Sequence, residues 1–307
     1  MQRSIEETPK ITVVTPSYNQ GAYLKETLGS IVAQNYPNVE IIVIDGGSTD
    51  DSKEVIESFS EHIAYWVSEP DKGQSHAINK GFAEATGDVL CWLNSDDVFL
   101  PGALNTVAQA FIAHPDWNWV TAPTLKFGEG FDVHEGIYKL PGSRAEWLVN
   151  CPISQPSTFW RRSLYDQLGG LDESFHYVMD FEYWLRLVFA GERPRWISRP
   201  LSAYRLHDVS KTVSQAEKFR IEEVRMRDLY VGKLDGRERS SLEKMLRDRE
   251  ALLELGAAVL LLGAARWDEA KERARAVFRS KPFLLLTRTG LASALRIWTR
   301  RPRQPKS

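Results

Sequence analysis

Two adjacent aspartates, Asp96 and Asp97, are the residues of this sequence best suited to do chemistry. They end the stretch 88–97, which begins as a short apolar run long enough for one buried strand. Two carboxylates this close repel each other unless a cation sits between or beside them. Their hard oxygen atoms suit Mg²⁺ or Mn²⁺, bound together with the phosphates of a substrate. The alternative is a strand that leads into an ordinary helix start at Pro101.

The elements that must position these acids are alternating strands and helices. Apolar runs rich in β-branched residues predict strands at 11–15, 39–44, 63–67 and 88–93, with amphipathic helices between them. This alternation is typical of βαβ units and a mainly parallel sheet. Open α/β sheets bind ligands at the carboxyl ends of their strands. We therefore expect one polar crevice lined by the four strand ends: Thr15–Asn19, Asp45–Ser48, Glu69–Gln74 and Asn94–Asp97.

Two of these strand ends carry single charged residues with a candidate role. Asp45 can accept a hydrogen bond from a base N–H such as that of uracil N3, and its alternative role is to cap the next helix. Lys72 can pair with a phosphate as a point charge, and its alternative is a solvated loop lysine. Neither residue decides the function by itself.

Four motifs follow one another along the first hundred residues: Val14–Asn19, Val43–Asp50, Glu69–Gly81 and Asn94–Asp97. Their order and spacing resemble those of glycosyltransferase family 2, over about residues 10 to 210. The resemblance implies an α/β protein with the GT-A (Rossmann-like) fold, a mixed but mainly parallel sheet flanked by helices. It also implies transfer of a sugar from a nucleotide-sugar, with inversion at the anomeric carbon.

On the donor side, the resemblance assigns residues to the nucleotide and to a Mn²⁺ or Mg²⁺ cofactor. The nucleotide-binding set is Pro16, Ser17, Asn19, Asp45, Lys72, Ser95 and Asp96. Asp97 is expected to be the direct metal ligand, with Asp96 beside it. The motif departs from a plain Asp-X-Asp because Asn94 stands at its first position, which leaves open whether Asn94 or Asp96 helps through water.

The later segments Gln155–Ser157, Gly169–Glu173 and Met179–Arg186 resemble the acceptor half of the same family. The resemblance makes Asp180 the catalytic base and places Gln155 and Arg186 on the acceptor side. The alternative role of Asp180 is a first-turn acid that favours the helix dipole. His207 is a candidate further ligand for metal or phosphate, although loop histidines more often serve neither purpose.

The expected partners are a UDP-, dTDP- or GDP-sugar and a glycan or lipid-linked acceptor, as in the synthesis of cell-surface polysaccharide or glycoconjugates. A second interpretation is a nucleotide-sugar-binding module without turnover that acts as a scaffold. A nucleotidyltransferase is disfavoured, because Pro16–Asn19 is not a glycine- and basic-rich triphosphate loop. The formal net charge of −2 argues against a nucleic-acid partner.

Two domains are expected, a glycosyltransferase domain at 1–213 and a helical region at 214–307. In the first, about 10–100 form the nucleotide-sugar half and 101–213 the acceptor half. The two cysteines form no disulfide framework, and the start of the chain has no apolar signal core, which favours a cytoplasmic protein.

The last segment of the chain is basic and apolar. From Lys281 onward it carries seven Lys or Arg and no acid, interleaved with leucines. Such a segment can lie on an anionic membrane at the cytoplasmic face. The alternative is a packed helix with a solvated charged end.

Overall fold

The computed structural model describes residues 8–128, 131–135, 139–206, 216–263 and 266–299, and it divides into two compact units, residues 1–232 and 233–307. The expected domain boundary at residue 213 falls one helix earlier than this division. Helix α9 (Ala216–Val231) belongs to the first unit, where Met226 and Tyr230 are buried. The helical region that begins a new unit therefore starts after α9.

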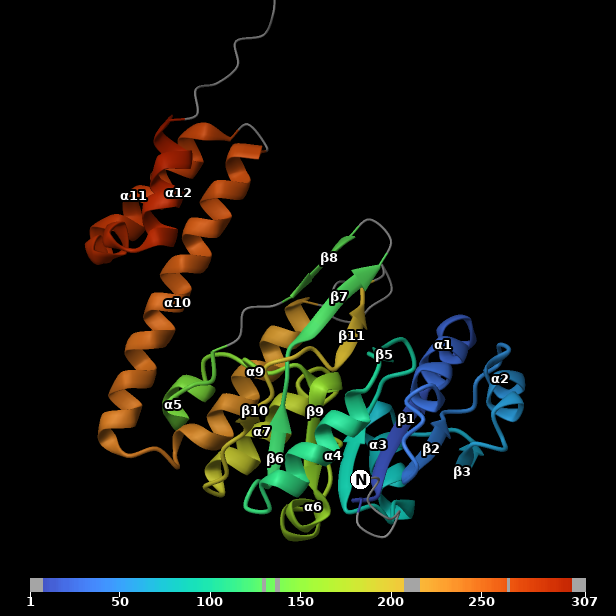
Figure 1. The fold of residues 1–307 in the computed structure, drawn as a ribbon. Coiled ribbons are helices and arrows are strands. Elements are labelled where there is room, and N and C mark those ends of the chain that lie inside the picture. The colour runs from blue at the N-terminus through green and yellow to red at the C-terminus, as the bar shows by residue number, and fades with distance from the viewer. Residues whose placement is uncertain (1–7, 129–130, 136–138, 207–215, 264–265, 300–307) are drawn as a thin grey trace, which may run out of the picture. The chain divides into compact units, whose positions relative to one another are not determined.

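Within the described residues, seven strands form the central sheet, in the order β10-β6-β9-β4-β1-β2-β3 (Figure 1). Strands β1 to β4 run parallel, and β9 lies antiparallel between β4 and β6. The mainly parallel sheet expected from the sequence is confirmed. The bounds are β1 Ile11–Ser17, β2 Val39–Asp45, β3 Ile63–Ser68, β4 Val89–Trp92, β6 Trp119–Thr121, β9 Thr158–Arg161 and β10 Arg195–Trp196.

Helices cover both faces of this sheet, and β1 is therefore buried on both sides. Ile11 and Val13 pack into an apolar cluster with residues of α1 (Gly21–Val32), α2 (Ser52–Ser58) and α4 (Ala103–Ala113). Val14 lies against α3 (Gln74–Glu84), where a Cβ on Gly81 would come within 2.4 Å of its Cγ1. The glycine thus allows α3 to approach the sheet closely.

A second sheet, with four strands in the described residues, has the order β5-β11-β7-β8. Its strand β5 (Val98–Phe99) begins directly after Asp97 and pairs antiparallel with β11 (Ser202–Arg205). In the same sheet, β7 (Thr124–Gly128) pairs antiparallel with β8 (Phe131–Glu135). The acid motif, which we define as Asn94–Asp97, therefore lies where the two sheets are joined.

A cluster of buried aromatic rings joins the two halves of the first unit. Trp92 of β4 stacks on Trp184 of α7 (Met179–Phe189) at a centroid distance of 5.8 Å. Trp119 and Trp160 also pack against Trp184, at 5.6 and 5.5 Å. Large rigid rings bury much apolar area in fixed geometry, so they hold α7 firmly against the strand that carries the acids. The remaining short elements are α5 Arg144–Trp147, η2 Gln155–Ser157 and α6 Arg162–Leu168.

The second unit contains α10 (Gly236–Gly263), α11 (Trp267–Ser280), η3 (Pro282–Leu286) and α12 (Arg288–Thr299). Ala258, Leu262, Ala270 and Ala274 form its core with neighbouring residues of the same unit. Among the helices of the described ranges, none has the length and apolar character needed to cross a bilayer.

Candidate active site

The loops after β1 and β2 are tied together by hydrogen bonds. The N–H of Gly46 donates to the carbonyl of Ser17 (2.8 Å), and the N–H of Asn19 donates to the Ser48 hydroxyl (2.8 Å). Asn19 has a φ of 51°, a left-handed conformation that asparagine tolerates. Its side-chain oxygen accepts from the N–H of Thr49 (2.9 Å). The segment that carries the predicted nucleotide residues Pro16, Ser17 and Asn19 is thus held in place by hydrogen bonds to the loop after β2.

The Ser17 hydroxyl is an unsatisfied polar group at this edge. Ser17 is 4% exposed, and its Oγ has no hydrogen-bond partner among the described residues. Buried polar atoms in native proteins are almost always paired with protein, water or ligand. The hydroxyl is therefore available to a ligand at the end of β1.

Asp45 is fully buried, and its carboxylate is engaged by the chain itself. One oxygen accepts from the Ser48 hydroxyl, and the other accepts from the Ser68 hydroxyl (2.6 Å) and the Ser48 N–H (2.9 Å). These contacts hold the turn after β2, and none of the hydrogen bonds of Asp45 among the described residues comes from an N–H group of α2, the helix that its alternative role would cap. A base could reach Asp45 only if one of these bonds were exchanged.

The loop after β3 completes the donor side. Lys72 is exposed there, in keeping with a side chain that could reach a phosphate. Asp71 accepts from the N–H of Gly73 (2.7 Å), which precedes the first residue of α3. A Cβ on Gly46 would come within 2.7 Å of the Asp71 carboxylate, so this loop and the β2 loop are in close contact.

The side chain of Asn94 makes hydrogen bonds to three other residues around the acid motif. Its side-chain oxygen accepts from Gln74 (2.8 Å), and its amide nitrogen lies 3.3 Å from Gln155 Oε1 and 3.4 Å from Asp97 Oδ2. Gln155 in turn donates to the carbonyl of Trp92 (2.7 Å). The predicted acceptor-side residue Gln155 therefore braces the acid motif from the other half of the unit.

The two aspartates differ in their access to solvent. Asp97 is 0% exposed, accepts from the N–H of Arg205 (3.1 Å), and has a pKa well above its ordinary value because of burial and the nearby charge of Asp96. Asp96 is partly exposed, and Ser95 before it is buried. Asp97, the expected direct ligand, is thus the less accessible of the two. In the described part of the chain no group of three His, Cys, Asp or Glu side chains is arranged to hold a metal ion.

Arg205 was not singled out by sequence analysis, yet it secures the acid motif. Its Nε donates to the carbonyl of Asp96 (3.1 Å), and its guanidinium pairs with Glu26 and lies over the rings of Tyr23 and Phe127. These partners come from α1, β7 and the strand-end loop. Only the tertiary structure brings them together, so no local sequence signal could have identified the role.

The first two residues of α3 connect the acid motif to the start of α7. Gln74 donates to Asn94, and its neighbour Ser75 donates to the carbonyl of Phe175 (2.9 Å) and lies 2.9 Å from Met179 Sδ. Met179 directly precedes Asp180. The structure therefore places the predicted metal motif and the predicted base on two sides of one helix N-terminus.

Asp180 lies in the first turn of α7, partly buried, and accepts from the N–H of Phe181 (2.7 Å). Burial raises its pKa above the ordinary aspartate value. Burial raises the pKa of the nearby Cys151 thiol, and the negative charge of Asp180 raises it further. A carboxyl of this kind is suited to accept a proton.

Glu222 of α9 caps the turn that carries Asp180. Its carboxylate accepts from the N–H groups of His176 (3.0 Å), Tyr177 (2.7 Å) and Val178 (3.2 Å), three donors at the start of α7. His176, Tyr177 and Val178 form the turn that leads into α7, which begins at Met179. Sequence analysis assigned Glu222 to a separate helical region and missed this contact.

Arg186 and Glu182 form a buried support behind the site. Arg186 pairs with Glu182 (2.6 Å) and donates to the carbonyls of Leu168 (3.1 Å) and Gly170 (2.7 Å), while Tyr230 donates to Glu182 (2.7 Å). Arg186 therefore holds the loop of the acceptor half in place. His207, the candidate further ligand, lies outside the described residues.

Comparison with known proteins agrees with this architecture. The family model described as glycosyl transferase family 2 matches residues 12–169. An uncharacterized glycosyltransferase from Mycobacterium tuberculosis is 35% identical over 190 residues, which cover 60% of this chain and 71% of that protein. A probable glycosyltransferase from Bacillus subtilis is 27% identical over 189 residues, 56% of this chain and 45% of the relative.

Solved structures share the fold. S. aureus TarS 1–349 in complex with UDP-GlcNAc superposes with a TM-score of 0.61 at 18% identity, over 94% of this chain and 78% of that one. The chain spans only 43% of a longer TarS structure. A mannosyltransferase from Pyrobaculum calidifontis in complex with GDP-Man and Mn²⁺ superposes with a TM-score of 0.57 at 19% identity, over 96% and 88% of the two chains.

Proposed function

We propose that this chain, which belongs to glycosyltransferase family 2 and is a glycosyltransferase, moves a sugar from a nucleoside diphosphate sugar to an acceptor hydroxyl with inversion. One observation carries the proposal. In the donor half, Gly46 contacts both Ser17 and Asp71, which links the loops after β1, β2 and β3. At the start of α3, Gln74 donates to Asn94, which donates in turn to Gln155. These contacts join the strand ends of the donor half to the acceptor half.

The donor is proposed to lie over the ends of β1 and β2 and at the N-terminus of α3. The unsatisfied hydroxyl of Ser17 and the side chain of Asn19 offer hydrogen bonds to the nucleoside. Lys72 and the first N–H groups of α3 offer positive charge and donors to the diphosphate. The nucleotides bound by the two structural neighbours, UDP-GlcNAc and GDP-Man, support this class of donor.

A divalent cation, Mn²⁺ or Mg²⁺, is proposed to be held by Asp96. Such ions commonly bind through one or two carboxylates together with substrate phosphates, and Asp96 presents a partly exposed carboxylate at the required strand end. When bound, the cation supplies positive charge that stabilises the leaving diphosphate. The buried Asp97 stabilises this position of Asp96 by accepting hydrogen bonds from the Asn94 amide and the Arg205 N–H.

Asp180 is proposed to be the base. As the acceptor oxygen forms its bond to the anomeric carbon, the bond from that carbon to the diphosphate oxygen breaks, and the hydroxyl proton passes to the Asp180 carboxylate. Attack from the face opposite the leaving group inverts the anomeric configuration. The acceptor is proposed to be a glycan or a lipid-linked sugar.

The test is a screen of UDP-, dTDP- and GDP-sugars for binding, hydrolysis and transfer with Mn²⁺ present. We expect one donor class to bind and to be turned over, and Asp180→Asn to retain binding while turnover is lost. Binding without any turnover in the native protein would favour a scaffold that only binds nucleotide-sugars. Absence of affinity for every nucleotide would overturn the donor site itself.

A further inference from the structure

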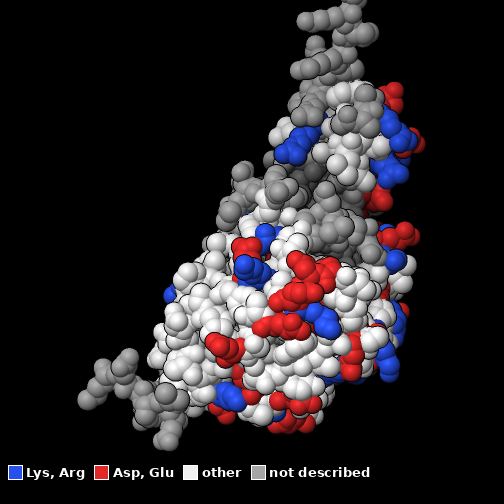
Figure 2. Space-filling model, turned by 90° about the vertical axis from the view of Figure 1, so that its right-hand side faces the viewer, with Lys and Arg blue, Asp and Glu red and all other residues white. Residues whose placement is uncertain are grey.

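The two units of this chain carry opposite charge. Residues 233–307 contain 18 Lys or Arg against 9 Asp or Glu, a net charge of +9. Residues 1–232 contain 21 against 32, a net charge of −11. Acidic side chains are prominent on the face of the first unit in Figure 2. Such an asymmetry within one chain points to a polyanionic surface as the partner of the basic unit.

The segment from η3 to α12 is only half used in packing. Leu284 and Ile297 are 7% and 0% exposed and contribute to the core of the second unit. Phe283 and Leu286 are 78% and 84% exposed, and Leu291, Leu295 and Trp298 are also exposed. The packed helix considered from the sequence is therefore present, but it leaves a row of large apolar side chains unburied.

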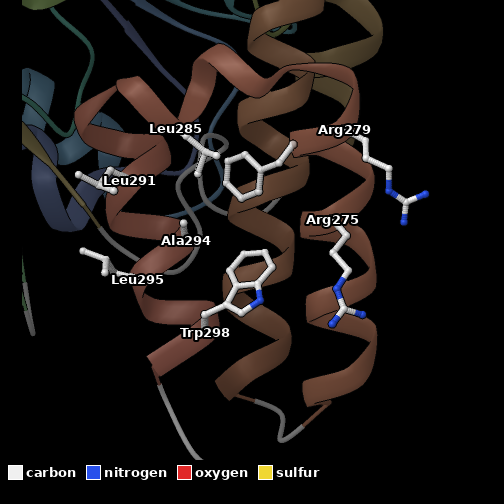
Figure 3. Close-up of a pocket in the computed structure, with 8 residues that line it drawn as sticks. Arg275, Arg279, Leu285, Leu291, Ala294, Leu295 and Trp298 are labelled. Carbon is white, nitrogen blue, oxygen red and sulfur yellow. The ribbon is translucent and has the colours of Figure 1, made fainter.

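Leu291, Leu295 and Trp298 of α12, together with Leu285 of η3, line an open apolar hollow of about 520 Å³. Figure 3 shows Leu285, Leu291, Leu295 and Trp298 lining it, with Arg275 and Arg279 extending outward from α11. Both arginines are exposed, and no ion pair within the described residues involves either one. The lining contains no acidic residue. Apolar surface and unpaired positive charge thus occur together.

We propose that this face, defined by Phe283, Leu285, Leu286, Leu291, Leu295 and Trp298 with the flanking Arg275 and Arg279, docks on an anionic lipid bilayer. The apolar side chains enter the boundary between headgroups and acyl chains, and the arginines bind lipid phosphates. The charge favours a bilayer over a protein partner of ordinary composition, since the chain has no acid from Lys281 to its end. The proposal does not depend on the proposed transferase activity.

The experiment measures sedimentation of the full-length protein with vesicles of phosphatidylcholine alone or mixed with phosphatidylglycerol. We expect binding to the mixed vesicles that weakens as salt is added. The double variant Phe283→Ser/Leu286→Ser should bind at least a hundredfold more weakly, about 3 kcal/mol for the two apolar side chains together. Arg275→Gln/Arg279→Gln should bind roughly thirtyfold more weakly, about 2 kcal/mol for the two charges together.

Matched controls are Leu253→Ser, an exposed leucine of α10, and Arg247→Gln, an exposed arginine of the same helix. Both should bind vesicles as the native protein does, and all variants should keep native circular dichroism. Equal binding to neutral vesicles, or equal losses in the controls, would overturn the proposal. So would native vesicle binding by Phe283→Ser/Leu286→Ser together with a change from dimer to monomer, which would identify the face as a protein interface.

Discussion

At the scale of single residues, Asp96 and Asp97 are neighbours that differ in what they can reach. Asp97 is buried and accepts from Arg205, whereas Asp96 retains exposed surface. We predict that Asp96→Ala loses the stimulation of nucleoside diphosphate binding by Mn²⁺, about ten- to a hundredfold for one charged contact, and keeps a near-native Tm.

Asp97→Ala is the matched variant. It should lower the Tm, because it leaves the Arg205 N–H without its acceptor in a buried place and removes one of the two acceptors of the Asn94 amide, at a cost of about 1–3 kcal/mol. Calorimetry with and without Mn²⁺ measures both effects. If Mn²⁺ strengthens binding equally in Asp96→Ala and the native protein, Asp96 is not the ligand.

Asp180 permits a prediction about pH. A base must be ionised to accept a proton, so activity should fall as pH drops through the pKa of Asp180. Because burial raises that pKa, the acid limb of kcat should lie above the ordinary aspartate value of about 3.9. In Asp180→Asn, kcat should fall by roughly two to four orders of magnitude with donor affinity retained.

The control for Asp180 is Glu182→Gln, two residues along the same helix. Glu182 pairs with Arg186 and accepts from Tyr230, so this change should lower the Tm and leave the acid limb where it was. Near-normal kcat in Asp180→Asn would remove the base assignment. A loss of the acid limb in Glu182→Gln alone would transfer the role to Glu182.

At the scale of elements, α9 holds the start of α7 through Glu222. We predict that Glu222→Ala lowers kcat at least tenfold with the donor KM unchanged, because three backbone donors beside Asp180 lose their acceptor, at a cost of about 1–2 kcal/mol. Glu222→Gln should restore part of the rate, since the amide oxygen still accepts.

Glu217→Ala removes an exposed acid from the same helix and serves as its control. Steady-state kinetics and thermal denaturation are measured together for all three variants. A fall in Tm with kcat unchanged would show that Glu222 stabilises the fold without positioning the base.

At the scale of the whole molecule, the first unit includes α9 and ends near Gly232. We predict that a chain of residues 1–232 folds and binds nucleoside diphosphate as the native protein does. A chain of residues 1–213 should have a clearly lower Tm, because it lacks the buried Met226 and Tyr230 as well as Glu222. Equal stability of the two truncated chains would place the boundary at residue 213.

The order of strands and helices in the first hundred residues can be predicted from local sequence patterns. Their apolar runs and polar ends are local patterns, and β1 to β4 follow the expected spans to within one or two residues. The four motifs also indicated the family that the comparison then showed. Local patterns suffice here because each strand and helix is specified by its own period of apolar residues.

Which side chains are accessible to a substrate depends on contacts between distant parts of the chain. Asp96 and Asp97 cannot be ranked from their spacing, because their difference lies in burial beneath Arg205, about a hundred residues later in the chain. The same is true of Glu222, whose cap on α7 depends on how α9 packs. Accessibility and hydrogen-bond partners are properties of contacts between distant segments, and a local sequence pattern carries no record of them.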